Sequence, residues 1–239
     1  MTDRPILFSG PMVRAIHARL KTNTRRVLRI KGHKTFSEFG PSDTRGYDWH
    51  FRDAEMRWHD LRYEELLKRL PHQVGDRLWV REAWRTHVAY EDLAPRDMGG
   101  EEPIRYEADG YLETWGWPFM DAPGRYRQGM HMPRWASRTT LVVTDVRVQR
   151  LQEISEEDAI AEGVEKIDYD GNDPRYMGEY GWRDYRDHPH AEVPFKKPID
   201  SFRPLWDSLN AARGYGWGQN PWVTATTYTV HRCNIDQIS

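Results

Sequence analysis

The stretch from residue 139 to 149 constrains the fold most, because its side chains alternate with the period of two that a half-buried β-strand requires. Every second position carries a β-branched residue: Thr140, Val142, Thr144, Val146 and Val148. β-branched side chains pack well on a pleated surface. The core of this chain is therefore predicted to include a β-sheet.

Shorter patterns place further elements around this strand. Further strands are predicted at 6–8, 25–30, 78–84, 104–108 and 222–230, and helices at 10–20, 62–70, 156–163 and 201–214. Two polar stretches lack a period, at about 31–61 and 165–198, and are read as long loops or insertions. We predict one domain over residues 1–239, of mixed α+β class and rich in β. A small barrel or partly open sheet would carry helices at its ends and two long polar insertions.

Composition limits the class of protein. The chain has 38% hydrophobic and 30% charged residues, but its 11 Trp and 12 Tyr can each bury a large area, so an aromatic core is expected. Cys233 is the only cysteine, which excludes internal disulfides and cysteine zinc sites. No apolar run approaches the roughly 18 residues of a membrane span, and no signal peptide is evident. We expect a cytoplasmic protein without a membrane partner.

Positive charge is concentrated near the N-terminus. No carboxylate occurs between Asp3 and Glu38, while that window holds nine Lys and Arg residues. Because the formal net charge of the chain is −2, an anion such as phosphate would be attracted locally rather than by the whole protein. The alternative is that these cations follow a helix end, complement its dipole and otherwise lie in water. Both interpretations remain open at the level of sequence.

Lys21 and Thr24 suggest a specific chemistry within this basic segment. If the preceding helix frays through the segment, residues three apart lie on one face. A threonine hydroxyl becomes nucleophilic when a base takes its proton, and a lysine whose pKa falls toward about 7 or 8 can do so. Arg25 and Arg26 would supply the neighbouring positive charge, and Glu82 is the candidate carboxylate that orients the amine. The structural alternative is a buried polar network that positions the first helix.

The pattern Lys21-x-x-Thr24-x-Arg26 resembles the Gly-x-Lys-x-x-Thr-x-Arg signature of the ASCH superfamily, with Arg19 at the position of the glycine. The segments 4–26, 75–84, 131–163 and 202–223 are similar to bacteriophage and prophage proteins that carry this domain. The resemblance covers somewhat under half of the chain. It implies a PUA-like fold, which is a small β-barrel with flanking helices.

The resemblance also implies two activities. ASCH domains are thought to bind RNA or other nucleic acids in a cleft of the barrel, so the partner would be nucleic acid or a modified pyrimidine nucleoside. Some small members are amidohydrolases that remove the acetyl group of N4-acetylcytidine with a threonine, a lysine and a glutamate. Thr24 would then be the nucleophile, Lys21 the base and Glu82 the third group. A phage structural or interaction protein without catalysis is a further alternative, with the two insertions as contact surfaces.

Other residues are expected to assist binding rather than chemistry. Arg19, Arg25 and Arg26 would contact phosphate, and tryptophans beside turns would stack on bases. The tryptophans expected to be exposed for this purpose are Trp135, Trp217 and Trp222. His188 and His190, with Asp187 and His131, could hold a metal, but solvated loop histidines are the simpler interpretation. No metal or other cofactor is therefore predicted, and the sequence leaves the oligomeric state open.

Overall fold

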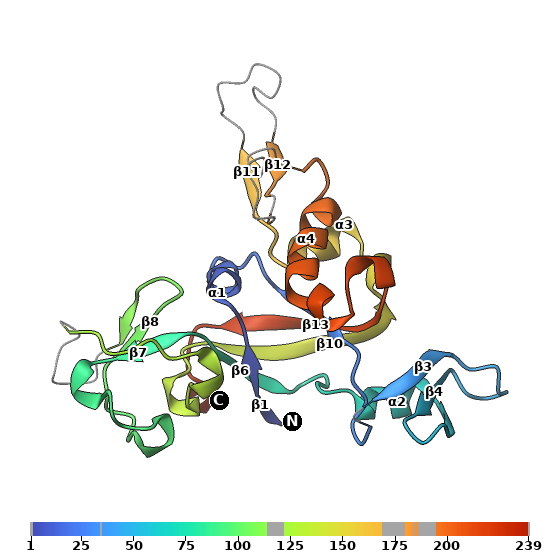
Figure 1. Ribbon diagram of the computed structural model, residues 1–239, viewed down its shortest axis with the longest axis horizontal. Coiled ribbons are helices and arrows are strands. Elements are labelled where there is room, and N and C mark those ends of the chain that lie inside the picture. The colour runs from blue at the N-terminus through green and yellow to red at the C-terminus, as the bar shows by residue number, and fades with distance from the viewer. Residues whose placement is uncertain are drawn as a thin grey trace. The chain divides into compact units, whose positions relative to one another are not determined.

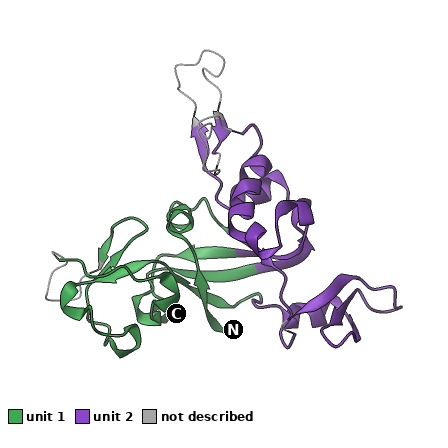
Figure 2. Ribbon diagram, in the orientation of Figure 1, with its two compact units in different colours: residues 1–22, 74–144, 228–239 green, residues 23–73, 145–227 purple. Residues whose placement is uncertain are grey.

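The computed structural model describes residues 2–33, 35–113, 122–168, 180–183, 185 and 195–238. The chain divides into two compact units (Figure 2). Unit 1 comprises Met1–Thr22, Val74–Thr144 and Tyr228–Ser239, and unit 2 comprises Asn23–Gln73 and Asp145–Thr227. The predicted class is confirmed at its coarser level, because the chain is mixed α+β and strand-rich. The sheets formed by the described residues are open, and none of them closes into a barrel.

Unit 1 is built on strands from distant parts of the sequence (Figure 1). Strand β1 (Asp3–Leu7) lies parallel to β6 (Arg77–Arg81), and β6 pairs antiparallel with the start of β10 (Thr140–Arg150). A second antiparallel sheet contains β7 (Trp84–Thr86), β8 (Ile104–Tyr106) and β9 (Leu112–Glu113). Short 3₁₀ helices span Val88–Tyr90, Pro95–Asp97, Gly129–His131, Arg134–Ala136 and Ile235–Gln237. The strand predicted at 139–149 is thus present.

Helix α1 (Gly10–His17) ends earlier than predicted. It begins after Ser9 with proline in its first turn, and it buries Val13 and Ile16. Beyond it, Arg19 adopts a φ of 59°, and strand β2 (Asn23–Val27) follows. The helical spacing assumed for residues 21–24 therefore does not apply, because this segment leaves the helix before Lys21.

Unit 2 combines helices with an antiparallel pairing of β2 and β13 (Trp222–His231). Its helices are α2 (Tyr63–Arg69), α3 (Glu156–Ala161) and α4 (Pro198–Asn210). Ser155 accepts a hydrogen bond from the backbone N–H of Asp158 and so caps α3, as its sequence predicts. Short 3₁₀ helices span Leu151–Glu153, Ala211–Arg213 and Trp217–Gln219.

The stretch 31–61 is wrongly predicted as a loop. It contains an antiparallel sheet of β3 (Phe36–Pro41), β4 (Trp49–Asp53) and β5 (Trp58–Leu61). Aromatic pairs stabilise it, such as Phe39 stacked on Trp49 with ring centroids 5.2 Å apart. Pro41 is tolerated because β3 is an edge strand of this sheet. Within 165–198, the described residues include the pair β11 (Lys166–Asp168) and β12 (Tyr180–Trp182), and most of the remaining positions lie outside the described residues.

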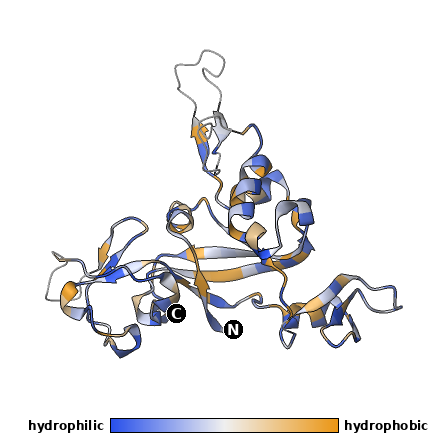
Figure 3. Ribbon diagram, viewed as in Figure 1, coloured by the Kyte–Doolittle hydropathy of each residue, from blue (hydrophilic) through white to orange (hydrophobic). Residues whose placement is uncertain are grey.

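Each unit has its own hydrophobic cluster. In unit 1 the buried members are Trp84, Met98, Ile104, Tyr106, Met132 and Ala136. In unit 2 they are Leu151, Ile154, Ala159, Val164, Trp182, Phe202, Trp206 and Val223. Hydrophobic and hydrophilic residues are interspersed along the elements of both units (Figure 3). Among the described residues, none of the helices has the length and hydropathy needed to span a membrane.

Candidate functional site

Lys21 and Glu82 are both buried in unit 1. Each residue is only 1% exposed, and Glu82 lies between strands β6 and β7. The Lys21 ammonium is 5.8 Å from the centre of the Phe8 ring. Lysine and glutamate are rarely buried to this degree unless they are paired. The interpretation of Lys21 as a solvated cation at a helix end is therefore wrong.

Arg138 holds the Glu82 carboxylate. Its Nε and Nη2 donate to the two carboxylate oxygens, each at 2.8 Å, which is the bidentate geometry of a strong ion pair. Nη2 also donates to Asp109 Oδ1 at 3.0 Å, and the guanidinium lies 4.0 Å from the centre of the Tyr106 ring. Burial raises the pKa of Glu82, while the hydrogen bonds and charge of Arg138 act in the opposite direction.

His17, at the end of α1, extends this set of contacts. Its Nε2 lies 2.8 Å from Thr139 Oγ1, and its Nδ1 lies 3.6 Å from Asp109 Oδ2. Burial lowers the pKa of His17, and the positive charge of Arg138 lowers it further. A lowered pKa favours the neutral form of the imidazole over the charged form. We call these five residues, His17, Glu82, Asp109, Arg138 and Thr139, the Arg138 network.

The Arg138 network brings together groups that can move protons. It contains an imidazole with a lowered pKa beside a hydroxyl, and a buried carboxylate with a raised pKa, a combination typical of acid–base sites. It also has a structural role, because it joins the end of α1 to residues more than 90 positions away. Of this set, only Glu82 was predicted from the sequence. His17, Asp109, Arg138 and Thr139 are separated along the chain and form no recognisable motif.

Gly129 fixes the backbone at Glu82 by close packing. A Cβ atom at this position would lie 2.8 Å from Leu7 Cδ1 and 2.9 Å from the carbonyl carbon of Glu82. Side chains do not tolerate such distances, so only glycine fits without displacement. The position of Glu82 therefore depends on a residue far along the chain.

In unit 2, Thr24 and Arg25 are buried on strand β2, with Thr24 5% exposed. Arg25 Nη2 pairs with Asp158 Oδ2 at 2.5 Å, and Nη1 pairs with Glu162 Oε1 at 3.2 Å. The Arg25 side chain is 0% exposed. Arg25 was predicted to contact a ligand, but its guanidinium is committed to two carboxylates of helix α3 and its C-terminal end. Its role in the structure is to attach this helix to β2.

Arg19 and Arg26 are exposed, in contrast to Arg25. The tryptophans predicted to be exposed are instead half-buried. Trp135 and Trp217 pack against the hydrophobic clusters of their units, and Trp222 contacts Phe39, Trp49 and Arg150. Among the described tryptophans, Trp58 is more accessible, with 50% of its surface exposed.

The histidines considered for a metal do not add to this site. His131 is exposed, while Asp187, His188 and His190 lie outside the described residues.

None of the protein families, curated proteins or solved structures compared with the chain matches it.

Proposed function

We propose that this chain is an ASCH-type protein that binds nucleic acid, with RNA the favoured partner, or a modified pyrimidine nucleoside. The observation that carries the proposal is the burial of Lys21, which is the lysine of the signature. Burying a lysine costs free energy that a purely solvated role would avoid. The proposal includes a PUA-like arrangement of the strands and a role for the Arg138 network in the same unit as Lys21.

Two further observations support this assignment. Arg19 occupies the glycine position of the signature, and its φ of 59° is the left-handed conformation that glycine adopts most readily. Arg26, the arginine of the signature, is exposed on β2 and carries a positive charge suited to a phosphate. Arg25 is not part of the proposed contact surface, because its guanidinium pairs with Asp158 and Glu162.

Binding of RNA is expected to weaken when Lys21 is replaced by methionine, which keeps the length of the side chain but removes its charge. Dissociation constants would be measured for RNA, single-stranded DNA and modified nucleosides over a range of salt concentrations. The wild-type affinity for RNA should fall with salt, as expected for contacts to phosphate. Arg105→Met is the control, because it removes a charge in the same way from a half-exposed cation of unit 1 outside the proposed site.

Two results would contradict the proposal. One is the absence of measurable affinity for all three ligand classes. The other is a Lys21→Met variant that folds and binds as tightly as the wild type. Co-purification with virion or host proteins, without any nucleic-acid binding, would favour an interaction protein instead.

A second candidate function is amide hydrolysis on an N4-acylated cytidine. The observation that favours it is that Lys21, Thr24 and Glu82 are each at most 5% exposed. In this reaction the Thr24 hydroxyl would attack the amide carbonyl while Lys21 takes its proton. The cytosine amine would leave with a proton, and water would then release the acyl group as a carboxylate and regenerate Thr24. Glu82, held by Arg138, would orient the lysine.

Release of acetate from N4-acetylcytidine is expected to fall by at least about 10³-fold in Thr24→Ala, because the nucleophile is lost. Thr24→Ser retains a hydroxyl and should keep part of the activity. Acetate release would be measured beside the circular dichroism spectrum of each variant. If the wild type releases no acetate, this activity is excluded for that substrate. The proposal of nucleic-acid binding is tested separately, by the dissociation constants described above.

A further inference from the structure

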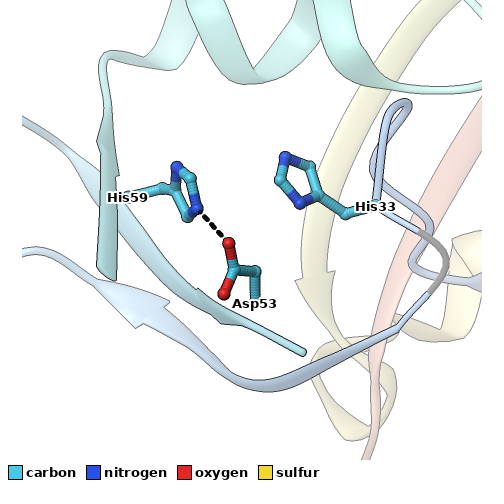
Figure 4. A group of neighbouring side chains, drawn as sticks. All are labelled: His33, Asp53 and His59. Atoms are coloured by element: carbon cyan, nitrogen blue, oxygen red, sulfur yellow. Dashed lines mark hydrogen bonds and ion pairs between the residues drawn. The ribbon is translucent and has the colours of Figure 1, made fainter. Parts of the chain in front are cut away.

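Three side chains that the functional proposal does not use converge in unit 2 (Figure 4). They are His33, Asp53 and His59, and their potential ligand atoms all lie within 4.8 Å of one another. Two imidazoles and one carboxylate form a donor set that zinc and related divalent transition metals prefer. We refer to these residues as the His33 triad.

Local structure positions each member of the triad. His33 ends a turn in which its N–H donates to the Ile30 carbonyl at 3.1 Å, and Gly32 within that turn has a φ of 87°. Glycine is favoured at such a position because a side chain would be strained there. Asp53 ends β4 and His59 lies on the neighbouring strand β5. The three residues thus come from one turn and two paired strands.

Phe51 holds both imidazole rings in place. It is fully buried and stacks on His59 with ring centroids 4.6 Å apart and planes 10° from parallel. The edge-on contact between Phe51 and His33 has a centroid distance of 4.7 Å and an angle of 71°. One buried aromatic ring therefore limits the orientation of both histidines. Because both imidazoles are already held by packing, less side-chain conformational entropy is lost when a ligand binds.

Asp53 is oriented in the same way by groups around it. Its side chain is 1% exposed, and Oδ1 accepts the backbone N–H of Arg57 at 2.9 Å. Oδ2 accepts from Arg57 Nε at 2.9 Å and lies 2.7 Å from His59 Nε2. Metal-binding carboxylates are commonly fixed by hydrogen bonds of this kind. The Arg57 side chain is 66% exposed, so its charge is screened by water.

We propose that the His33 triad binds zinc or a related divalent transition metal ion. In a tetrahedral zinc site with bonds of about 2.0–2.1 Å, the ligand atoms lie roughly 3.3 Å apart. The triad reaches this geometry if His59 Nε2 and Asp53 Oδ2 separate slightly and His33 moves inward. His59 then coordinates the metal in place of its contact with Asp53. Three protein ligands leave a fourth position for water or a substrate group.

His33 distinguishes this proposal from a simple hydrogen-bonded pair. A contact between His59 and Asp53 stabilises the β4–β5 hairpin without a third partner. A second imidazole, with its ring centre 5.0 Å from that of His59, is not needed for that hydrogen bond but completes a donor set. The site lies within unit 2 and does not depend on nucleic-acid binding or on Thr24.

Zinc binding to the full chain tests the proposal. Protein stripped with a chelator would be titrated with Zn²⁺ in competition with a chromogenic chelator, and one equivalent is expected to bind. Co²⁺ in place of zinc should give the visible absorption of a tetrahedral site. We expect His33→Ala and Asp53→Asn each to weaken zinc binding by about 100-fold or more, since even supporting residues contribute 10–100-fold. His50→Ala is the control, because His50 lies on β4 beside Trp58.

His33→Ala is the decisive variant, because it leaves the contacts of Asp53 with His59 and Arg57 in place. Its fold would be checked by the amide NMR signals of β3, β4 and β5. The proposal is overturned if the wild type binds no stoichiometric zinc. It is also overturned if folded His33→Ala binds zinc as tightly as the wild type and His50→Ala do.

Discussion

Replacing Arg138 with methionine is expected to lower the free energy of unfolding of unit 1 by about 3–5 kcal/mol. Arg138 donates two hydrogen bonds to the Glu82 carboxylate, which is only 1% exposed. Without the guanidinium, this buried carboxylate loses its ion pair. Urea denaturation followed through the amide NMR signals of β6 would measure the change. Arg105→Met should change the same quantity by less than about 0.5 kcal/mol, because Arg105 is 44% exposed.

The double variant Glu82→Gln and Arg138→Met separates a lost charge pair from lost packing. Because glutamine is uncharged, the double variant has no buried charge at position 82 that lacks its ion pair. Most of the stability lost in Arg138→Met should therefore return. If the double variant is no more stable than Arg138→Met, the pair acts through packing against Tyr106 rather than through charge. If Arg138→Met alone leaves the free energy of unfolding unchanged, the ion pair between Arg138 and Glu82 does not stabilise unit 1.

Elements defined by local patterns were predictable. The strand predicted at 139–149 corresponds to β10, the helix predicted at 201–214 overlaps α4, and the strand predicted at 222–230 corresponds to β13. These elements were recognisable from the residue types along the sequence, but burial in β10 does not follow the expected alternation, because Leu141 and Val143 are buried while Thr144 is exposed. The sheet at 36–61 was missed because aromatic pairing between strands, rather than alternation along one strand, supplies much of its apolar contact.

The sites were harder to predict, for a related physical reason. Lys21 was identified because a signature surrounds it, but its burial depends on tertiary packing. His17 meets Thr139 across 122 positions of sequence, and no local pattern encodes such a contact. The His33 triad escaped notice because its members come from a turn and two strands in a stretch interpreted as a loop. Arg25 and Arg26 are adjacent and chemically identical, so composition alone gave them the same role.

Arg25 and Arg26 are expected to respond in opposite ways to the same substitution. Arg25→Met should destabilise unit 2 by about 3–5 kcal/mol, because it leaves Glu162 buried without this ion pair. Arg26→Met should change stability by less than about 0.5 kcal/mol, since the side chain is exposed. It should instead weaken RNA binding and reduce the slope of log affinity against log salt by about 1.

Unfolding would be followed through amide signals of α3, and RNA affinity would be measured at several salt concentrations in conditions where both variants are folded. The side chains have the same composition and neighbouring positions on β2, so each variant serves as the control for the other. If Arg25→Met weakens RNA binding while α3 keeps its stability, Arg25 contacts the ligand and its pairs with Asp158 and Glu162 are incidental. If Arg26→Met leaves the salt dependence unchanged, the exposed arginine of the signature does not touch phosphate, and the proposed binding surface has to exclude it.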